Sequence, residues 1–196
     1  MVEIKFCGAC GSAVKRAIPH GDSRLRFMCE SCGRIHYQGP SVLVVVTVLA
    51  QDHVLLIKRG TQPYRGTWAP PGGFVESNES LQEAALREVE EECGLRLVKT
   101  TLSTPVMVSV PNLNQIHACF VAKHHTLASV RPSPPETTDA KWFTRASLPL
   151  SLLWAPAQNC DLDAVFAEGQ WRPRLVARPC PSFGVVSRDA RVAVSA

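Results

Sequence analysis

Residues 73–95 read GFVESNESLQEAALREVEEECGL, and this stretch decides how the rest of the chain is interpreted. Its middle has the pattern of a helix. Ser77 or Asn78 can cap the N-terminus, and Glu79 suits the first turn. Gly94 can adopt the left-handed conformation that ends many helices. The stretch therefore predicts a capped helix that stops at Gly94.

Three glutamates line one stripe of this predicted helix. At about 100° per residue, Glu88 and Glu92 lie one turn apart beside the apolar face, with Glu91 next to them. Like charges one turn apart cost a helix roughly 0.2 to 0.5 kcal/mol per pair, and Arg87 is the nearby side chain that can offset them. Clustered carboxylates suit a hard divalent cation such as Mg²⁺, which also binds substrate phosphates. The pattern predicts a metal site, and an ordinary solvated acidic helix face is the alternative.

The segment before the helix favours the metal site. Residues 70–73 read PPGG, in which two prolines make the chain rigid and two glycines let the backbone approach a ligand closely. This context favours a ligand site over a solvated acidic face.

The spacing of the fixed residues points to a known family. Gly73, Glu79 and the run REVEEECGL at 87–95 match the Nudix box, GX5EX7REUXEEXGU with U aliphatic, at every fixed position. The chain thus resembles Nudix hydrolases, which cleave a nucleoside diphosphate linked to another group X with the help of Mg²⁺ or Mn²⁺. The resemblance implies an α/β fold, the Nudix α/β/α sandwich with a mixed sheet, and a homodimer.

The resemblance also implies roles for individual side chains. The implied metal ligands are Glu88 and Glu92, with Glu91 as a further ligand and the carbonyl of Gly72 as a backbone ligand. Arg87 and Glu79 would brace the loop and the helix through charge-assisted hydrogen bonds instead of contacting the substrate.

In many Nudix enzymes an acidic residue in a later loop approaches the metal site as general base or extra ligand. Glu136 is the nearest match in this chain and Asp139 is the second, although a solvated loop acid is an equal alternative for either. Glu136 or one of the box glutamates would take the proton of the attacking water.

Two CxxC pairs near the N-terminus predict a second metal site. Cys7 and Cys10 precede Cys29 and Cys32 by a segment long enough for a hairpin, which is the spacing of a zinc ribbon. Each pair offers two thiolates to one tetrahedral Zn²⁺ ion. Disulfides are the weaker alternative, because the N-terminus lacks a basic and then apolar export signal. A redox CxxC is less favoured, because one pair would be sufficient.

The ribbon carries more basic than acidic residues. The basic side chains are Lys5, Lys15, Arg16, Arg24, Arg26 and Arg34, and the acidic ones are Glu3, Asp22 and Glu30. Contact with nucleic acid is one interpretation, but the net charge is modest and no aromatic ladder alternates with the basic residues. We favour a structural or dimer-contact role for the ribbon.

The remaining chain predicts strands on both sides of the box. Residues 41–49, SVLVVVTVL, form a continuous β-branched run that is typical of a strand buried on both faces. Further strands are expected at 54–58, 98–101, 105–110, 115–123 and 140–143. Trp68 is interpreted as a packing residue, His117 as an ordinary strand or loop residue, and Arg59 is left open between a phosphate contact and a strand-end charge.

Length and composition fit one main domain with a small accessory unit. The chain has 196 residues, 45% of them hydrophobic, and a net charge of +4, so it can bury one good core. We expect a zinc ribbon at 1–38, a Nudix domain at 39–155, and a C-terminal helix with a basic tail at 156–196. No apolar run reaches the roughly eighteen residues that span a bilayer, so a cytoplasmic protein is expected.

The wider pattern narrows the expected substrates. The ribbon followed by HYQGP at 36–40, LLIKR at 55–59 and TWAPPGGFVE at 67–76 resembles a Nudix subgroup of ADP-ribose and FAD pyrophosphatases. Pro70 stands where Leu is usual, Asn78 stands where Gly is usual, and the SQPWPFPxS array of NADH pyrophosphatases is absent.

We expect AMP release from ADP-ribose or FAD. A Nudix hydrolase for NADH, capped RNA or oxidised nucleotides is the alternative, as is a non-catalytic ADP-ribose-sensing or nucleic-acid-binding module. The intact REVEEE run at 87–92 favours catalysis, because a sensor need not keep a multi-carboxylate metal site.

Overall fold

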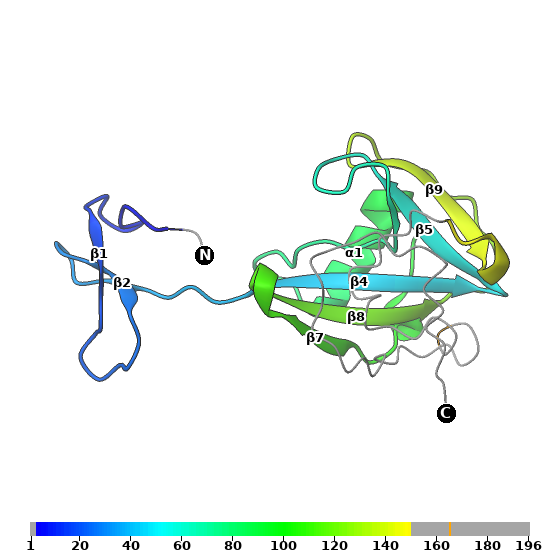
Figure 1. Cartoon of the computed structure of the whole chain (residues 1–196). Coiled ribbons are helices and arrows are strands. Elements are labelled where there is room, and N and C mark those ends of the chain that lie inside the picture. Colours follow the sequence, from blue (N-terminus) through cyan, green and yellow to red (C-terminus); the bar gives the residue numbers. More distant parts are fainter. Residues whose placement is uncertain (1–2, 150–164, 166–196) are drawn as a thin grey trace, which may run out of the picture. The chain divides into compact units, whose positions relative to one another are not determined.

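Residues 3–149 and 165 are described by the computed structural model, and they fall into two units that divide between Pro40 and Ser41 (Figure 1). Most of the C-terminal helix and basic tail expected at 156–196, and the domain boundary expected at 155, lie outside the described residues. Val165 is described, and it is helical and buried. No helix in the described part of the chain is long and apolar enough to cross a membrane. The cytoplasmic location stays a prediction.

The N-terminal unit is a small antiparallel sheet. Its strands pair in the order β1 (Val14–Ala17), β2 (Arg26–Cys29) and β3 (Ile35–His36). The deeply buried side chains of this unit are those of Cys7, Pro19 and Cys29. These are too few to form an apolar core, so a bound metal would have to supply folding free energy.

The second unit is built on a mixed six-stranded sheet. Its strands are β4 (Ser41–Ala50), β5 (His53–Arg59), β6 (Trp68–Ala69), β7 (Val106–Val110), β8 (Gln115–Lys123) and β9 (Thr137–Thr144). The order is β6-β5-β4-β8-β7, and β9 pairs with β5.

β4 and β8 run parallel at the centre of the sheet, with Ser41 opposite Gln115 and Leu49 opposite Lys123. The other strand pairs are antiparallel. A parallel pair needs a long crossover, and this crossover contains the helix, which lies against the sheet (Figure 1). The expected fold class, an α/β fold with a mixed sheet preceded by a ribbon, is confirmed.

Helix α1 (Leu81–Cys93) begins later than its sequence suggests. Its N-cap is Ser80, whose hydroxyl accepts from the Glu83 N–H at 3.3 Å, while the Glu83 carboxylate accepts from the Ser80 N–H at 2.7 Å. The caps expected at Ser77 and Asn78 are therefore wrong. The reciprocal pair satisfies two N–H groups at once, which a single capping side chain does not.

After α1 the chain turns sharply, and the segment that follows does not form the strand expected there. Gly94 ends the helix with a left-handed φ of +66°, as expected. Residues 98–101 contain the short 3₁₀ helix η1 (Lys99–Thr101), so the strand expected there is wrong. The Thr101 hydroxyl donates to the Val98 carbonyl at 2.7 Å, a local bond that competes with strand pairing. Two further 3₁₀ turns are η2 (Pro111–Leu113) and η3 (Arg145–Ser147).

Apolar side chains pack on both faces of the sheet. On the α1 side, Val89 of the helix shares a buried cluster with Val46 and Phe120 of the central strands. A second cluster contains Trp68, whose ring meets Phe143 edge-on at a centroid distance of 4.9 Å. The packing role predicted for Trp68 is confirmed. The first cluster fixes α1 against the sheet, and it therefore fixes the glutamates on the edge of the helix.

Candidate active site

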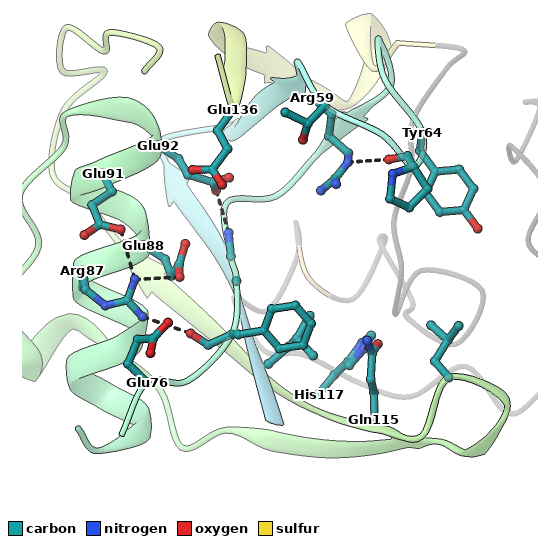
Figure 2. A pocket seen from close by; sticks show the side chains of 17 residues that line it. Arg59, Tyr64, Glu76, Arg87, Glu88, Glu91, Glu92, Gln115, His117 and Glu136 are labelled. Atoms are coloured by element: carbon teal, nitrogen blue, oxygen red, sulfur yellow. Dashed lines mark hydrogen bonds and ion pairs between the residues drawn. The ribbon is translucent and has the colours of Figure 1, made fainter. Parts of the chain in front are cut away.

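A pocket of the sheet unit contains the glutamates predicted to act in catalysis. Its volume is about 520 Å³, and it is lined by α1, the loop before it, β4, β8 and the loops next to β5 and β9 (Figure 2). Its acidic end is formed by Glu88, Glu91, Glu92 and Glu136. Its far end is formed by Gln115 and His117 (Figure 2). Leu43, which pairs with His117 in the sheet, and Phe74, which bridges to Leu43, also line the pocket, as does Leu113.

Arg87 connects the acidic end to the loop before α1. Its guanidinium donates to Glu88 at 2.8 Å and to Glu91 at 3.0 Å. It also donates to both carboxylate oxygens of Glu79, at 3.0 Å and 2.7 Å, and to the Phe74 carbonyl at 3.0 Å. The bonds from Arg87 lower the pKa of Glu79 to about 2, and Glu79 in turn raises the pKa of Arg87. These charge-assisted bonds support the bracing role predicted for the pair.

The two glycines of the PPGG segment lie directly against the acidic end. The Gly72 N–H donates to Glu92 Oε2 at 2.8 Å. A Cβ on Gly73 would lie 2.4 Å from Glu88 Oε1, so glycine is what allows this carboxylate to approach the backbone. The glycines thus lie beside the glutamates, and their direct role in metal binding stays a prediction.

Burial and mutual repulsion disfavour the ionised form of two glutamates. Burial raises the pKa of Glu92 to about 8, and the charges of Glu88 and Glu136 add to this shift. Burial likewise raises the pKa of Glu88. Desolvated carboxylates that repel one another fit a divalent cation, which would favour their ionised form. The donors are all oxygen atoms, which suits Mg²⁺ or Mn²⁺.

Glu136 lines the pocket from the loop before β9, whereas Asp139 does not belong to the lining that the structure describes. Asp139 lies within β9 and forms an ion pair with Lys141 at 2.5 Å. The Glu136 carbonyl accepts from the Gly60 N–H at 2.7 Å. The geometry therefore favours Glu136 over Asp139 as the fourth acid.

Thr137 attaches the Glu136 loop to the end of α1. Its side chain is fully buried, and its hydroxyl donates to the Glu92 carbonyl at 2.9 Å and accepts from the Ser133 N–H at 2.7 Å. In a second hydrogen bond, the Arg131 N–H donates to the carbonyl of Cys93, the last residue of α1, at 2.9 Å. The loop is thus fixed to the helix that carries the other acids.

Arg59 adds positive charge to the same pocket. It ends β5, and its Nε donates to the Pro63 carbonyl at 3.2 Å. Arg59 and Glu136 both line this pocket (Figure 2). This position favours a phosphate contact over an ordinary strand-end charge.

Gln115 and His117 line the far end, a role that their sequence context does not indicate. Residues two apart on a strand share a face, so their spacing does predict that they lie together. Their approach to the PPGG segment depends on the pairing of β8 with β4 and on the bond from the Val44 N–H to the Gly73 carbonyl at 2.9 Å. Only this long-range register brings them to the pocket.

The four cysteines of the ribbon come together as predicted, with all four sulfur atoms within 4.8 Å of one another. Cys7 Sγ lies 3.7 Å from Cys32 Sγ, and Cys10 Sγ lies 3.5 Å from Cys29 Sγ. The backbone N–H and the hydroxyl of Ser12 lower the pKa of the Cys10 thiol to about 6, which favours the thiolate that zinc binds. The donor set fits a tetrahedral structural Zn²⁺.

The glutamates are more widely spaced than the cysteines. Among the described residues, no second group of three ligand side chains is as close as the cysteines are. Wider spacing suits Mg²⁺, which keeps several waters and takes substrate phosphate oxygens as ligands.

Comparison with family models gives a match for each unit of the chain. A model described as NUDIX domain matches residues 38–160, and a model described as Nudix N-terminal matches residues 5–38.

Known proteins are similar to this chain over most of its length. The NAD-capped RNA hydrolase NudC of Vibrio vulnificus is 30% identical over 146 residues, which are 74% of this chain and 53% of the relative. The 8-oxo-dGDP phosphatase NUDT18 of Mus musculus is 31% identical over 150 residues, which are 75% of this chain and 46% of the relative. The crystal structure of a NUDIX hydrolase from Nitrosomonas europaea matches with a TM-score of 0.67 at 35% identity, covering 76% of this chain and 83% of that one. The chain spans about half the length of the curated relatives it matches.

Proposed function

Because the chain belongs to the Nudix family, we propose that it hydrolyses the diphosphate bond of a nucleotide in which ADP is joined to a second group, releasing AMP. The observation that carries the proposal is the convergence of Glu88, Glu92 and Glu136 on one pocket. At the same place the backbone of Gly72 and Gly73 lies close to the carboxylates of Glu92 and Glu88. Acids gathered in this way require a cationic partner, and a diphosphate bound with a metal supplies the counterpart.

We propose that Glu88, Glu91 and Glu92 hold the divalent ion, Mg²⁺ or Mn²⁺, with the Gly72 carbonyl as a further ligand. When bound, this ion would neutralise phosphate oxygens and lower the pKa of a water molecule. Arg87 keeps Glu88 and Glu91 in place, and the Gly72 N–H keeps Glu92 in place.

Glu136 is the proposed general base. Its loop is held by the Gly60 N–H on one side and by Thr137 on the other, so its carboxylate stays at the acidic end. It would take a proton from the water that attacks phosphorus in line. Arg59 would bind the phosphate oxygens with its planar guanidinium.

Two classes of substrate are candidates for the group that is joined to ADP. The resemblance favours ADP-ribose or FAD, whereas several bacterial relatives are named for NAD-capped RNA. All of these substrates contain ADP joined through its diphosphate to another group. The mouse relative is named for 8-oxo-dGDP, a nucleoside diphosphate that lacks the second group. Homodimer formation, a ribbon contact with RNA and the structural role of the ribbon stay predictions.

Product analysis tests this proposal. The purified chain would be incubated with Mg²⁺ and, separately, with ADP-ribose, FAD, NADH, NAD-capped RNA and 8-oxo-dGDP, and products would be identified by chromatography and mass spectrometry. Glu92→Gln should reduce turnover by about 10³-fold, because a ligand to the ion and to the developing charge is lost. The matched control is Glu90→Gln on the same helix, because Glu90 is exposed and bonds Arg96 at 2.6 Å.

The pattern of products decides between the candidates. AMP from ADP-ribose or FAD identifies the first class, and nicotinamide mononucleotide together with 5′-phosphorylated RNA from NAD-capped RNA identifies the second. If the wild-type chain cleaves none of these substrates with Mg²⁺ or Mn²⁺, the proposed activity is wrong.

A further inference from the structure

The far end of the pocket contains a polar pair next to apolar side chains. Gln115 and His117 lie on one face of β8, Leu43 lies opposite His117 in the pairing of β4 with β8, and Leu113 also lines the pocket. His117 Nε2 lies 3.0 Å from Gln115 Oε1. Figure 2 shows the pair across the pocket from the four acids.

The burial of His117 requires an explanation. The residue is 2% exposed, and burial lowers its pKa, so the ring is neutral near pH 7. One ring nitrogen faces Gln115, and Nδ1 has no hydrogen-bond partner within the described part of the chain. A buried polar atom without a partner is destabilising, and an apolar side chain of similar size would avoid this. Core packing alone therefore does not account for an imidazole at this position.

The hydrogen bond explains what the imidazole contributes. Because the Gln115 Oε1 atom can only accept, His117 Nε2 carries the proton and donates it. The NH₂ group of Gln115 is then directed away from the ring and keeps two N–H donors. Gln115 is half-buried and lines the pocket, so these donors belong to a side chain that a bound molecule can reach.

The size and polarity of the pocket indicate the ligand. A volume of about 520 Å³ lies within the range of roughly 300 to 1,000 Å³ that is usual for small-molecule sites. One end is acidic and suits a diphosphate with its metal, so the other end faces the remainder of the same nucleotide. Apolar walls with one fixed polar group suit a flat heteroaromatic ring, whose faces are apolar and whose edge forms hydrogen bonds.

Building on the proposed function, we infer that the far end binds the nucleobase and that Gln115, oriented by His117, selects among bases by donating a hydrogen bond to the base edge. Gln115 is thus a specificity-determining residue that touches the substrate. His117 is a positioning residue that acts through Gln115. A site built to hydrogen-bond one partner rejects ligands that leave its polar group unpaired, so a single oriented amide is sufficient to discriminate between bases.

Binding of nucleoside monophosphates tests the inference without turnover. Dissociation constants of AMP, GMP, CMP and UMP would be measured by calorimetry for the wild-type chain, Gln115→Leu and Lys123→Leu. Lys123 is exposed at the opposite end of β8, so its variant is a same-strand control. We expect wild type to separate the tightest from the weakest nucleotide by about tenfold, Gln115→Leu to compress this range to about threefold, and Lys123→Leu to keep the wild-type order.

A second variant tests the positioning role. His117→Phe keeps a buried ring and removes the donor, and its melting temperature would be measured alongside. With nucleoside diphosphate sugars that differ only in the base, we expect KM for the preferred base to rise about fivefold to tenfold, with kcat within about twofold of wild type, because the reacting phosphorus lies at the acidic end.

The outcomes separate this inference from the proposed activity. Equal binding of the four nucleotides by wild type, binding of none of them, or an unchanged order in Gln115→Leu overturns the inference. Base-selective binding by wild type that is lost in Gln115→Leu supports the inference. A wild-type chain that binds nucleotides in this way but hydrolyses no substrate contradicts only the proposed activity.

Discussion

The ribbon gathers four cysteines and the sheet unit gathers four acids, but the two units hold these side chains in opposite ways. The cysteines lie in a unit with three deeply buried side chains, so little besides the ion can fix them. The acids lie on a helix and a loop that are already fixed by an apolar cluster, by Arg87 and by Thr137. The difference indicates that a metal ion stabilises the fold of the ribbon, whereas in the sheet unit a metal ion takes part in catalysis.

Removal of zinc should therefore have the largest structural effect, and it should be confined to the ribbon. Structural zinc contributes an apparent binding free energy of roughly 10 to 16 kcal/mol in small domains, far more than so small a core supplies. In Cys10→Ser, or after treatment with a zinc chelator, amide NMR signals of β1 and β2 should collapse while those of β4 and β8 remain dispersed. Cys119→Ala, which changes a cysteine of the sheet unit, should leave the ribbon signals unchanged. If the amide signals of the ribbon stay dispersed without zinc, the ribbon does not depend on the metal for its fold, and the proposed difference between the two units is wrong.

Changing an acid of the sheet unit should instead affect catalysis and leave the fold intact. Glu136→Gln should lower kcat by about 10²-fold, the lower range for loss of a general base, with no loss of melting temperature. Asp139→Asn is the control, because Asp139 pairs with Lys141 outside the pocket. Equal loss of activity in both variants would show that Glu136 and Asp139 act through the fold and not through the reaction.

Thr137 tests whether the position of the general base is set by the fold. Thr137→Val keeps the volume but loses the hydroxyl bonded to the Glu92 carbonyl and the Ser133 N–H. We expect kcat to fall about tenfold and the free energy of unfolding to fall by about 1 to 3 kcal/mol. Thr137→Ser, which restores the hydroxyl, should recover most of kcat. A Val variant that is destabilised but retains wild-type kcat would assign Thr137 a purely structural role.

The smallest expected effect is on pH dependence in the absence of divalent metal. The pKa of Glu92 is about 8 in the folded unit against an ordinary value of 4.5. Between these values the folded state retains a proton that the unfolded state has lost, so stability should fall as pH rises from about 4.5 to 8. Melting temperatures at pH 5, 6.5 and 8 should decline by a few degrees, and Glu92→Gln should remove most of this decline. A melting temperature that rises over this range would contradict the buried, repelling arrangement of the acids.

Features encoded by local pattern could be predicted from the sequence. The strands expected at 41–49 and 115–123 are found as β4 (Ser41–Ala50) and β8 (Gln115–Lys123), because the first is a continuous β-branched run and the second alternates apolar residues with polar or smaller ones. The spacing of the cysteines predicts their cluster for a similar reason, since each pair lies within one turn of chain. The left-handed end of α1 at Gly94 follows from the residue type.

Features that depend on competition between alternative hydrogen bonds, or on contacts between distant parts of the chain, could not be predicted from local sequence patterns. The cap at Ser80 prevails because Glu83 reciprocates its hydrogen bond, and the strand expected at 98–101 gives way to a turn closed by the Thr101 hydroxyl. Gln115 and His117 reach the pocket only through the parallel register of β8 with β4, which no local pattern specifies.

The parallel pairing of β4 with β8 also bears on the order in which the molecule folds. Ser41 pairs with Gln115 across a crossover that contains all of α1, so this contact closes a long loop and should form late on the folding pathway. Glu88 and Glu92 share a local helix and can be in place early. During synthesis, the helix glutamates would therefore be in place before β8 completes the far end and before Glu136 joins them, so nucleotide binding should report a late step of folding.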